Sequence, residues 1–225
     1  MSAGAIVCAI IPAKATSTRL PGKNLKHLAG KPMMAYIIEA AKRAKGVDRV
    51  IVTTESDEVK KIAEAYGAEV PFMRPRQLTL DDVTSQQVLQ HALEELAKKN
   101  YHPDYALLLY PTSPLLKTAR IEEAIRIALE KDSDSVISGT LDKGHYWIAD
   151  GERWSRLFPK ALVNSQQQEP LFKENGAIYL TKAPLIARQL VADRTDVLLM
   201  ESDENIDVDY PEDFAAVERI VQGSV

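Results

Sequence analysis

A short basic segment, IIPAKATSTRLPGKNL at residues 10–25, holds the first side chains that could do chemistry. It begins as a buried strand and continues into a turn-forming loop that carries Lys14, Arg19 and Lys23. An arginine can bind a phosphate through two parallel hydrogen bonds, whereas a lysine acts as a point charge. Hydroxyl side chains between the cations supply further donors. The loop predicts a polyphosphate site, and a solvated basic turn is the alternative.

The loop does not follow the common phosphate-binding motifs. In the Walker A pattern a glycine would stand at Ser17, and Ser or Thr would follow Lys23, where this chain has Asn24. The G-x-G-x-x-G pattern of dinucleotide-binding folds is also missing from the sequence. A nucleoside triphosphate held by cations and loop amides therefore fits better than a dinucleotide.

A second group of chemical interest is the IDVDY segment near the end of the chain. Alternate side chains of an extended segment share a face, so Asp207 and Asp209 should point together while Ile206 and Val208 turn into the core. Two converging carboxylates repel each other unless a cation lies between them. Carboxylate oxygens and nearby phosphates favour Mg²⁺. The alternatives are a solvated acidic turn, or a helix N-cap formed by Asp209.

The rest of the sequence alternates between strand and helix patterns, which predicts an α/β fold with a mostly parallel sheet covered on both faces. In such sheets ligands bind beyond the carboxyl ends of the strands, where the basic loop begins. The expected strands lie at 5–11, 49–54, 105–110, 135–140, 176–181 and 196–201. The expected helices lie at 32–46, 56–67, 85–99 and 119–131, and a last one begins at Pro211.

Composition limits the class of protein. The 225 residues, 45% of them hydrophobic, can form one domain over 1–225, with an inserted arm at about 141–174 that contains both tryptophans. A net charge of −4 argues against a nucleic-acid partner. The single cysteine, Cys8, lies in an apolar run and is expected in the core, which fits a reducing, cytoplasmic compartment. No apolar run is long enough for a membrane span.

Five blocks of sequence occur in an order that resembles one family. The blocks are IIPAKATSTRLPGKNL, RVIVTTESDEVKKIAEAYGAEVPFMRP, LLYPTSPL, ENGAIYL and IDVDYPEDF. Together they resemble the acylneuraminate cytidylyltransferases, also called CMP-sialic acid synthetases. The resemblance implies a Rossmann-like, three-layer nucleotidyltransferase whose arm makes a homodimer, with a tetramer as an alternative. It also implies that CTP and a sialic-acid-like or related 2-keto-3-deoxy sugar acid give CMP-sugar and pyrophosphate, with Mg²⁺ required and Mn²⁺ possible.

The resemblance also assigns residues at matching positions. The expected catalytic residues are Lys23, Arg19 and Asp209, and the expected metal ligands are Asp207 and Asp209. The expected nucleotide-binding residues are Ala13, Lys14, Ser17, Arg19, Lys23, Asn24, Arg74 and Ser85. The expected sugar-binding residues are Tyr110, Thr112, Ser113, Gln167, Lys173, Asn175 and Gly176.

The chain departs from the family pattern mainly at the sugar end. Tyr110 replaces a glutamine that faces the sugar, and Leu116, Ser165 and Lys173 stand where arginines are usual. A carboxylate acceptor loses bidentate partners by these changes. We expect a variant acceptor or a different base. The other readings are a glycosyltransferase, since Asp207–Asp209 is also a D-x-D string, and a nucleotide-binding paralogue without activity.

Overall fold

The computed structural model describes residues 4–17, 19–161, 164, 166–201, 204 and 206–223. Its centre is a six-stranded sheet in the order β10-β6-β9-β5-β1-β4, which is parallel except for β9. The sheet strands are β1 (Val7–Pro12), β4 (Arg49–Thr53), β5 (Tyr105–Leu109), β6 (Ser135–Asp142), β9 (Leu171–Lys182) and β10 (Thr195–Leu199). The α-helices are α1 (Met33–Arg43), α2 (Asp57–Ala65), α3 (Ser85–Ala97), α4 (Thr118–Lys131) and α5 (Pro211–Val221).

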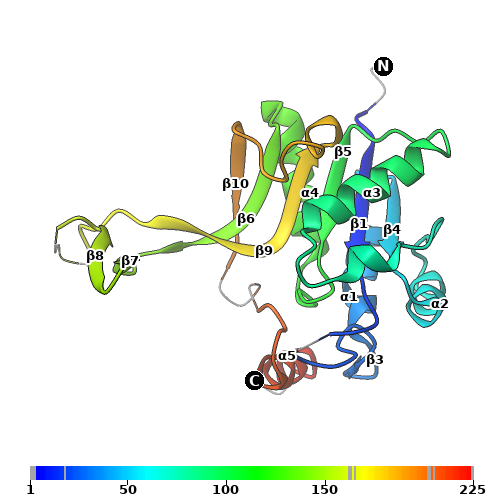
Figure 1. Ribbon diagram of the computed structural model, residues 1–225, viewed down its shortest axis with the longest axis horizontal. Coiled ribbons are helices and arrows are strands. Elements are labelled where there is room, and N and C mark those ends of the chain that lie inside the picture. Colours follow the sequence, from blue (N-terminus) through cyan, green and yellow to red (C-terminus); the bar gives the residue numbers. More distant parts are fainter. Residues whose placement is uncertain are drawn as a thin grey trace.

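Helices cover both faces of the sheet, as the continuous apolar strands predict (Figure 1). Buried residues of α1, α2 and α4 form one hydrophobic core with the sheet, and those of α3 form a second with β1 and β5. Cys8 belongs to this second core and is fully buried, as expected. The mostly parallel α/β sheet predicted from the sequence is therefore confirmed.

Several local predictions are also correct. The helix expected from residue 56 begins within one residue of that position, because α2 starts at Asp57 and Ser56 caps it by accepting a hydrogen bond from the Val59 N–H at 3.3 Å. Pro211 is the first residue of α5, as expected. One other needs correction. Pro32 is the N-cap of α1 and the end of β3 (Lys31–Pro32), which pairs with β2 (His27–Leu28), so it is not the first helical residue. Residues 206–209 are extended, as expected, and join no strand among the described residues.

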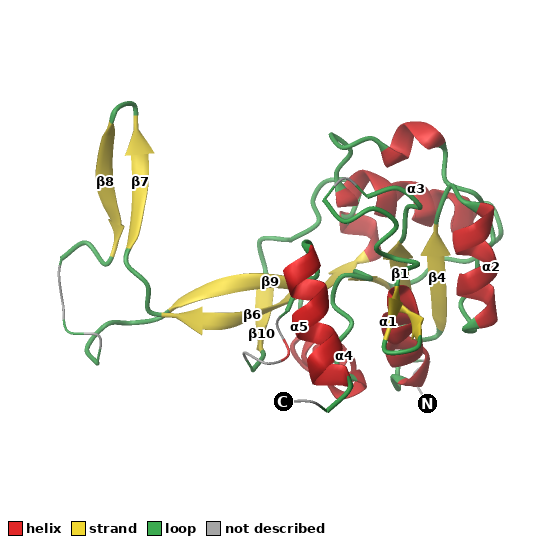
Figure 2. Ribbon diagram, turned by 90° about the horizontal axis from the view of Figure 1, so that it is seen from below, coloured by secondary structure: helices red, strands yellow, loops and turns green. Residues whose placement is uncertain are grey.

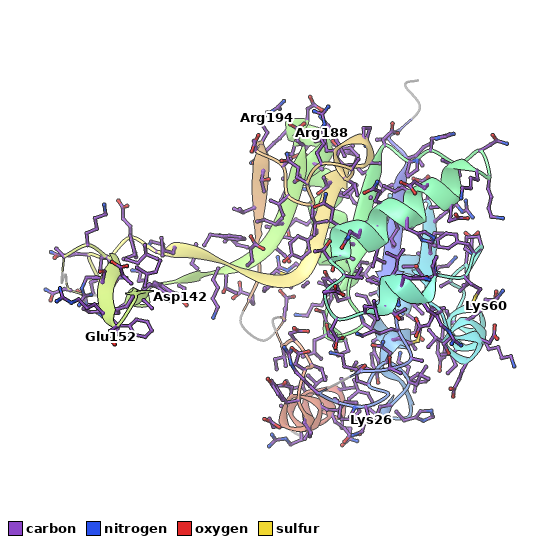
Figure 3. All side chains as sticks on the ribbon, in the orientation of Figure 1. Lys26, Lys60, Asp142, Glu152, Arg188 and Arg194 are labelled. Atoms are coloured by element: carbon purple, nitrogen blue, oxygen red, sulfur yellow. The ribbon has the colours of Figure 1, made fainter. Side chains whose placement is uncertain are left out.

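The predicted arm projects away from the sheet (Figure 2). β6 and β9 continue as a two-stranded ribbon, with Asp142 paired to Leu171, and beyond it β7 (Tyr146–Asp150) and β8 (Arg153–Phe158) form a hairpin. Figure 3 shows Asp142 and Glu152 in this projection, far from Lys60 on α2. The expectation of a strand at 176–181 is too short, because β9 begins at Leu171 and includes half of the ribbon.

The described part of the chain also contains shorter 3₁₀ segments. They are η1 (Arg76–Thr79) and η2 (Ala183–Leu185). Among the described residues, no helix is long and apolar enough to cross a membrane.

Candidate active site

The basic loop and the acidic segment meet, although they lie at opposite ends of the sequence. Lys23 Nζ is 2.8 Å from Asp209 Oδ1, and Arg19 forms an ion pair with the other oxygen of the same carboxylate. Lys23 Nζ also donates to the Val208 carbonyl oxygen at 3.2 Å. The guanidinium carbon of Arg19 lies 5.6 Å from the centroid of the Tyr210 ring. Both clusters can therefore contact one ligand.

A small hydrophobic core holds the two segments together. Leu20 from the basic loop and Val208 from the acidic segment pack with residues of β2, α1 and α5. Val208 is fully buried, and its N–H donates to the Thr112 carbonyl oxygen at 2.8 Å in the loop after β5. Burying such a side chain contributes about 1.5–3 kcal/mol. As the sequence predicts, Val208 faces the core while its two acidic neighbours face the cavity described below.

The two carboxylates differ in their electrostatic environment. Burial raises the pKa of Asp207, and the negative charge of Asp209 raises it further, while a hydrogen bond with Thr112 opposes the shift. Burial would also raise the pKa of Asp209, but hydrogen bonding and charge attraction from Lys23, with a contribution from Arg19, hold this pKa below its usual value. Asp209 does not cap α5: the Asp213 side chain accepts from the Tyr210 N–H at 2.8 Å.

A cavity of about 640 Å³ opens beside these residues, at the carboxyl ends of β1 and β5. Its volume is in the range of small-molecule sites. Predicted site residues line much of it: Lys14, Ser17, Arg19, Lys23, Asn24, Arg74, Ser85, Tyr110, Thr112, Gly176, Asp207 and Asp209. Residues predicted separately for the nucleotide, the acceptor and the metal therefore share one cavity.

The nucleotide-binding predictions lie on two walls of the cavity. Lys14 Nζ contacts Asp81 Oδ1 at 2.9 Å, and its carbonyl oxygen accepts from Asn24 Nδ2 at 2.8 Å, so Asn24 ties the two ends of the basic loop together. Arg74 is buried and forms an ion pair with Glu55 at 3.0 Å. Ala13 does not line the cavity; it is fully buried and its N–H donates to the Thr53 carbonyl oxygen.

At the predicted sugar end, Tyr110 is held on two sides. Its hydroxyl is 2.5 Å from Ser85 Oγ at the start of α3, and its ring meets the Tyr179 ring edge-on with centroids 6.4 Å apart. Burial raises the pKa of the Tyr110 phenol, so it stays protonated near neutral pH. Gly176, also in the cavity wall, has a φ of 74°, a backbone conformation that residues other than glycine rarely adopt. Thr112 completes this wall.

Four predicted sugar-binding residues lie outside the cavity wall. Ser113 is buried, and Asn175 Oδ1 accepts a hydrogen bond from Ser138 Oγ at 2.6 Å. Lys173 is exposed at the base of the arm, and Gln167 is exposed in the segment between β8 and β9. Ser165, a departure from the family pattern, lies outside the described residues. Leu116, another departure, is packed in the main core.

The sequence reasoning missed two parts of this region. Leu78, Thr79, Leu80, Asp81 and Val83 form a wall around η1 and the loop after it, and their composition gives no motif to find them by. Glu55 also went unnoticed, although it lies two residues after the end of β4, and the carboxyl end of a parallel strand is a place where functional side chains gather.

The acid pair fits a divalent cation that is shared with phosphates. Among the described residues, no group of three or more His, Cys, Asp or Glu side chains is arranged to hold a metal ion. Mg²⁺ does not need such a group, because it commonly binds one or two carboxylates together with substrate phosphates and water. The negative charge of Asp209 contributes to the raised pKa of Asp207, and a cation bound beside both carboxylates would relieve this repulsion.

Comparison with known proteins agrees with this geometry. The family model described as cytidylyltransferase matches residues 8–225. The chain is 31% identical over 223 residues to the CMP-N,N'-diacetyllegionaminic acid synthase of Legionella pneumophila, covering 96% of each chain. It is 32% identical to the N-acylneuraminate cytidylyltransferase of Escherichia coli, over 96% of this chain but only 52% of that protein.

A solved structure supports the fold. The CMP:2-keto-3-deoxy-manno-octonic acid synthetase in complex with CTP superimposes with a TM-score of 0.72, at 18% identity, covering 98% of this chain and all of that one. At this identity the likeness establishes the shared α/β architecture and not the details of the site.

Proposed function

Because this chain belongs to the cytidylyltransferase family, we propose that it couples CTP to a nonulosonic or related 2-keto-3-deoxy sugar acid, giving CMP-sugar and pyrophosphate. The observation that carries the proposal is the junction of Arg19, Lys23 and Asp209 at the cavity. At this junction, two cations and a carboxylate that could bind a metal ion surround the same space. A metal-bound triphosphate requires such an arrangement.

In this proposal the acceptor hydroxyl attacks the α-phosphorus of the nucleotide. A new P–O bond forms, the bond from the α-phosphorus to the bridging oxygen breaks, pyrophosphate leaves, and the hydroxyl proton passes to solvent. Lys23 and Arg19 release Asp209 and bind the phosphates, where their charges stabilise the negative charge on the leaving pyrophosphate. Such transfers depend mainly on positioning and charge stabilisation.

Asp207 and Asp209 are the residues that would hold Mg²⁺. When bound, the ion would supply further charge neutralisation at the phosphates. Lys14, Asn24, Arg74 and Ser85 would bind the nucleotide, and Tyr110, Thr112 and Gly176 would contact the acceptor, all from the wall of one cavity.

We also propose that the arm forms the contact between two copies of the chain. The protein would act in the cytoplasm. Trp154 is 68% exposed and Trp147 is 49% exposed on the β7–β8 hairpin. Aromatic residues are enriched at protein interfaces, and the hairpin has too little core of its own to bury them.

The test is a substrate panel. Purified protein with Mg²⁺ is given each of the four nucleoside triphosphates with a diacetyllegionaminic, an N-acylneuraminic or a 2-keto-3-deoxy-manno-octonic acid, and pyrophosphate release is measured. We expect release with CTP and at least one acid, and none without the acid. A protein that binds CTP and releases no pyrophosphate with any acid would contradict the proposal.

A further inference from the structure

Glu55 lies behind the cavity wall and joins two of its parts. Its side chain is 14% exposed and follows the carboxyl end of β4. Glu55 Oε1 accepts from the Ala15 N–H at 2.9 Å, and Oε2 accepts from Arg74 Nη2 at 3.0 Å. One carboxylate thus connects the basic loop to Arg74, two segments that are far apart in the sequence.

Arg74 is held firmly but is not fully used. Its side chain is 4% exposed, and its backbone N–H donates to the Thr54 carbonyl oxygen at 2.8 Å. Arg74 Nε is buried and has no hydrogen-bond partner within the described part of the chain. A buried donor without a partner costs about 1–3 kcal/mol, and Arg74 lines the cavity, so its guanidinium keeps hydrogen-bonding capacity for a bound ligand.

The positive charge of Arg74 is balanced by the negative charge of Glu55. Burial alone would raise the pKa of Glu55, but hydrogen bonds from the Ala15 and Glu55 N–H groups and from Arg74 hold it below its usual value. Glu55 is therefore ionised near neutral pH, and the buried pair carries no net charge. Such a pair offers directional hydrogen bonds to a neutral acceptor, such as a carbonyl oxygen of a nucleobase, more than attraction for phosphates.

We propose that Glu55 is a positioning residue for nucleotide binding, which fixes Arg74 and the Ala15 segment relative to each other so that both present hydrogen-bond donors to one nucleotide. This inference rests on the proposed function. Glu55 itself does not line the cavity, so it acts through its two partners.

Glu55→Gln tests the inference because an amide has only one accepting oxygen. Its NH₂ group would face either the Ala15 N–H or Arg74, and one of the two contacts would be lost. Glu55→Asp keeps both accepting oxygens. We expect CTP affinity, measured by calorimetry without acceptor, to fall about 10- to 100-fold in Glu55→Gln, and to fall less in Glu55→Asp. In steady state KM for CTP should rise while KM for the acceptor stays unchanged.

A matched control is available at the other end of β4, which begins at Arg49. Glu69 accepts from Arg49 at 3.0 and 2.5 Å, and neither residue lines the cavity, so Glu69→Gln breaks a similar pair elsewhere and should leave CTP affinity unchanged. A double-mutant cycle compares the effect of Glu55→Gln in the wild type and in Arg74→Gln. Glu55→Gln should weaken CTP binding less in the Arg74→Gln background, since the two residues act as a unit.

The outcomes separate the two proposals. If the wild-type protein does not bind CTP, the proposed function fails. If the wild type binds and Glu55→Gln binds equally well, or if Glu69→Gln weakens binding as much, the role of Glu55 is wrong. Circular dichroism and thermal unfolding establish that each variant is folded at the temperature of the titration.

Discussion

Lys23 and Asp209 are separated by 186 residues in sequence and by 2.8 Å in space. Both residues line the cavity, and their contact joins the loop after β1 to the segment before the last helix. In the described structure, Asp209 forms ion pairs with the cations that would hold a triphosphate. A nucleotide must therefore exchange these ion pairs for contacts with its own phosphates.

Replacing Asp209 should remove activity and leave the fold intact. We expect Asp209→Asn to lower kcat/KM about 100-fold or more, because it removes a proposed metal-binding carboxylate from the phosphates. Pyrophosphate release gives the measurement. Glu212→Gln, an exposed neighbour on α5, is the control and should behave as wild type. Near-normal turnover by Asp209→Asn would exclude a metal-binding role for this residue.

The charge of Lys23 should matter for the leaving group. We expect Lys23→Gln to lower kcat/KM for CTP by about 100-fold, since one charge near the developing pyrophosphate is lost. Lys26→Gln serves as the comparison, because the Lys26 ammonium lies 4.5 Å from the centroid of the Phe214 ring and the residue does not line the cavity. Equal effects of the two substitutions would point to overall charge instead of a site role.

Tyr110 should determine acceptor choice. In Tyr110→Gln the contacts with Ser85 and Tyr179 are lost. We expect KM for the preferred acid to change about fivefold or more, equivalent to about 1 kcal/mol, with KM for CTP nearly constant. Tyr110→Phe keeps the ring packing and separates the hydroxyl contribution. An effect on CTP alone would place Tyr110 at the nucleotide end.

The Glu55–Arg74 pair should make stability depend on pH in the acidic range. The folded protein lowers the pKa of Glu55 from its ordinary value of 4.5, so the stabilisation is fully present above pH 4.5 and is lost as pH falls through the lower folded-state pKa. Urea unfolding should show Glu55→Gln to be less stable than wild type by about 1–3 kcal/mol at pH 7. The difference should shrink below pH 4.5, and a constant difference down to pH 3 would contradict this explanation.

The arm should control assembly. We expect the wild type to be a dimer by light scattering after size exclusion, and Trp154→Lys with Leu157→Lys to shift it toward monomer, because both side chains are exposed on the hairpin and a charge opposes their burial. Leu129→Lys, at an exposed position of α4, should leave the dimer intact. A double variant that remains dimeric would move the interface away from the arm.

The sequence predicted the elements whose pattern is local. Continuous apolar strands such as β1, the helix near residues 56–67 and the Pro211 helix start depend on neighbouring residues, and the structure confirms them. The family and the α/β fold are likewise confirmed. Contacts that depend on tertiary placement were harder to predict. Glu55 resembles any carboxylate that follows a strand until Ala15 and Arg74 are placed on either side of it.

The extended segment before α5 illustrates the same division. Alternation correctly predicted that Val208 is buried and that Asp207 and Asp209 face the other way, because this pattern depends only on extended backbone. It could not predict that the segment is held by the Thr112 carbonyl oxygen and a small hydrophobic core, without a partner strand among the described residues.

The fate of labelled phosphate tests the central claim most directly. CTP labelled at the α-phosphate or the γ-phosphate is mixed with enzyme, Mg²⁺ and the acceptor found in the panel, and the products are separated. The α-label should move into a sugar-linked CMP product and the γ-label into pyrophosphate. Release of the γ-label as free phosphate, or of the α-label in CDP, would contradict attack at the α-phosphorus within this cavity.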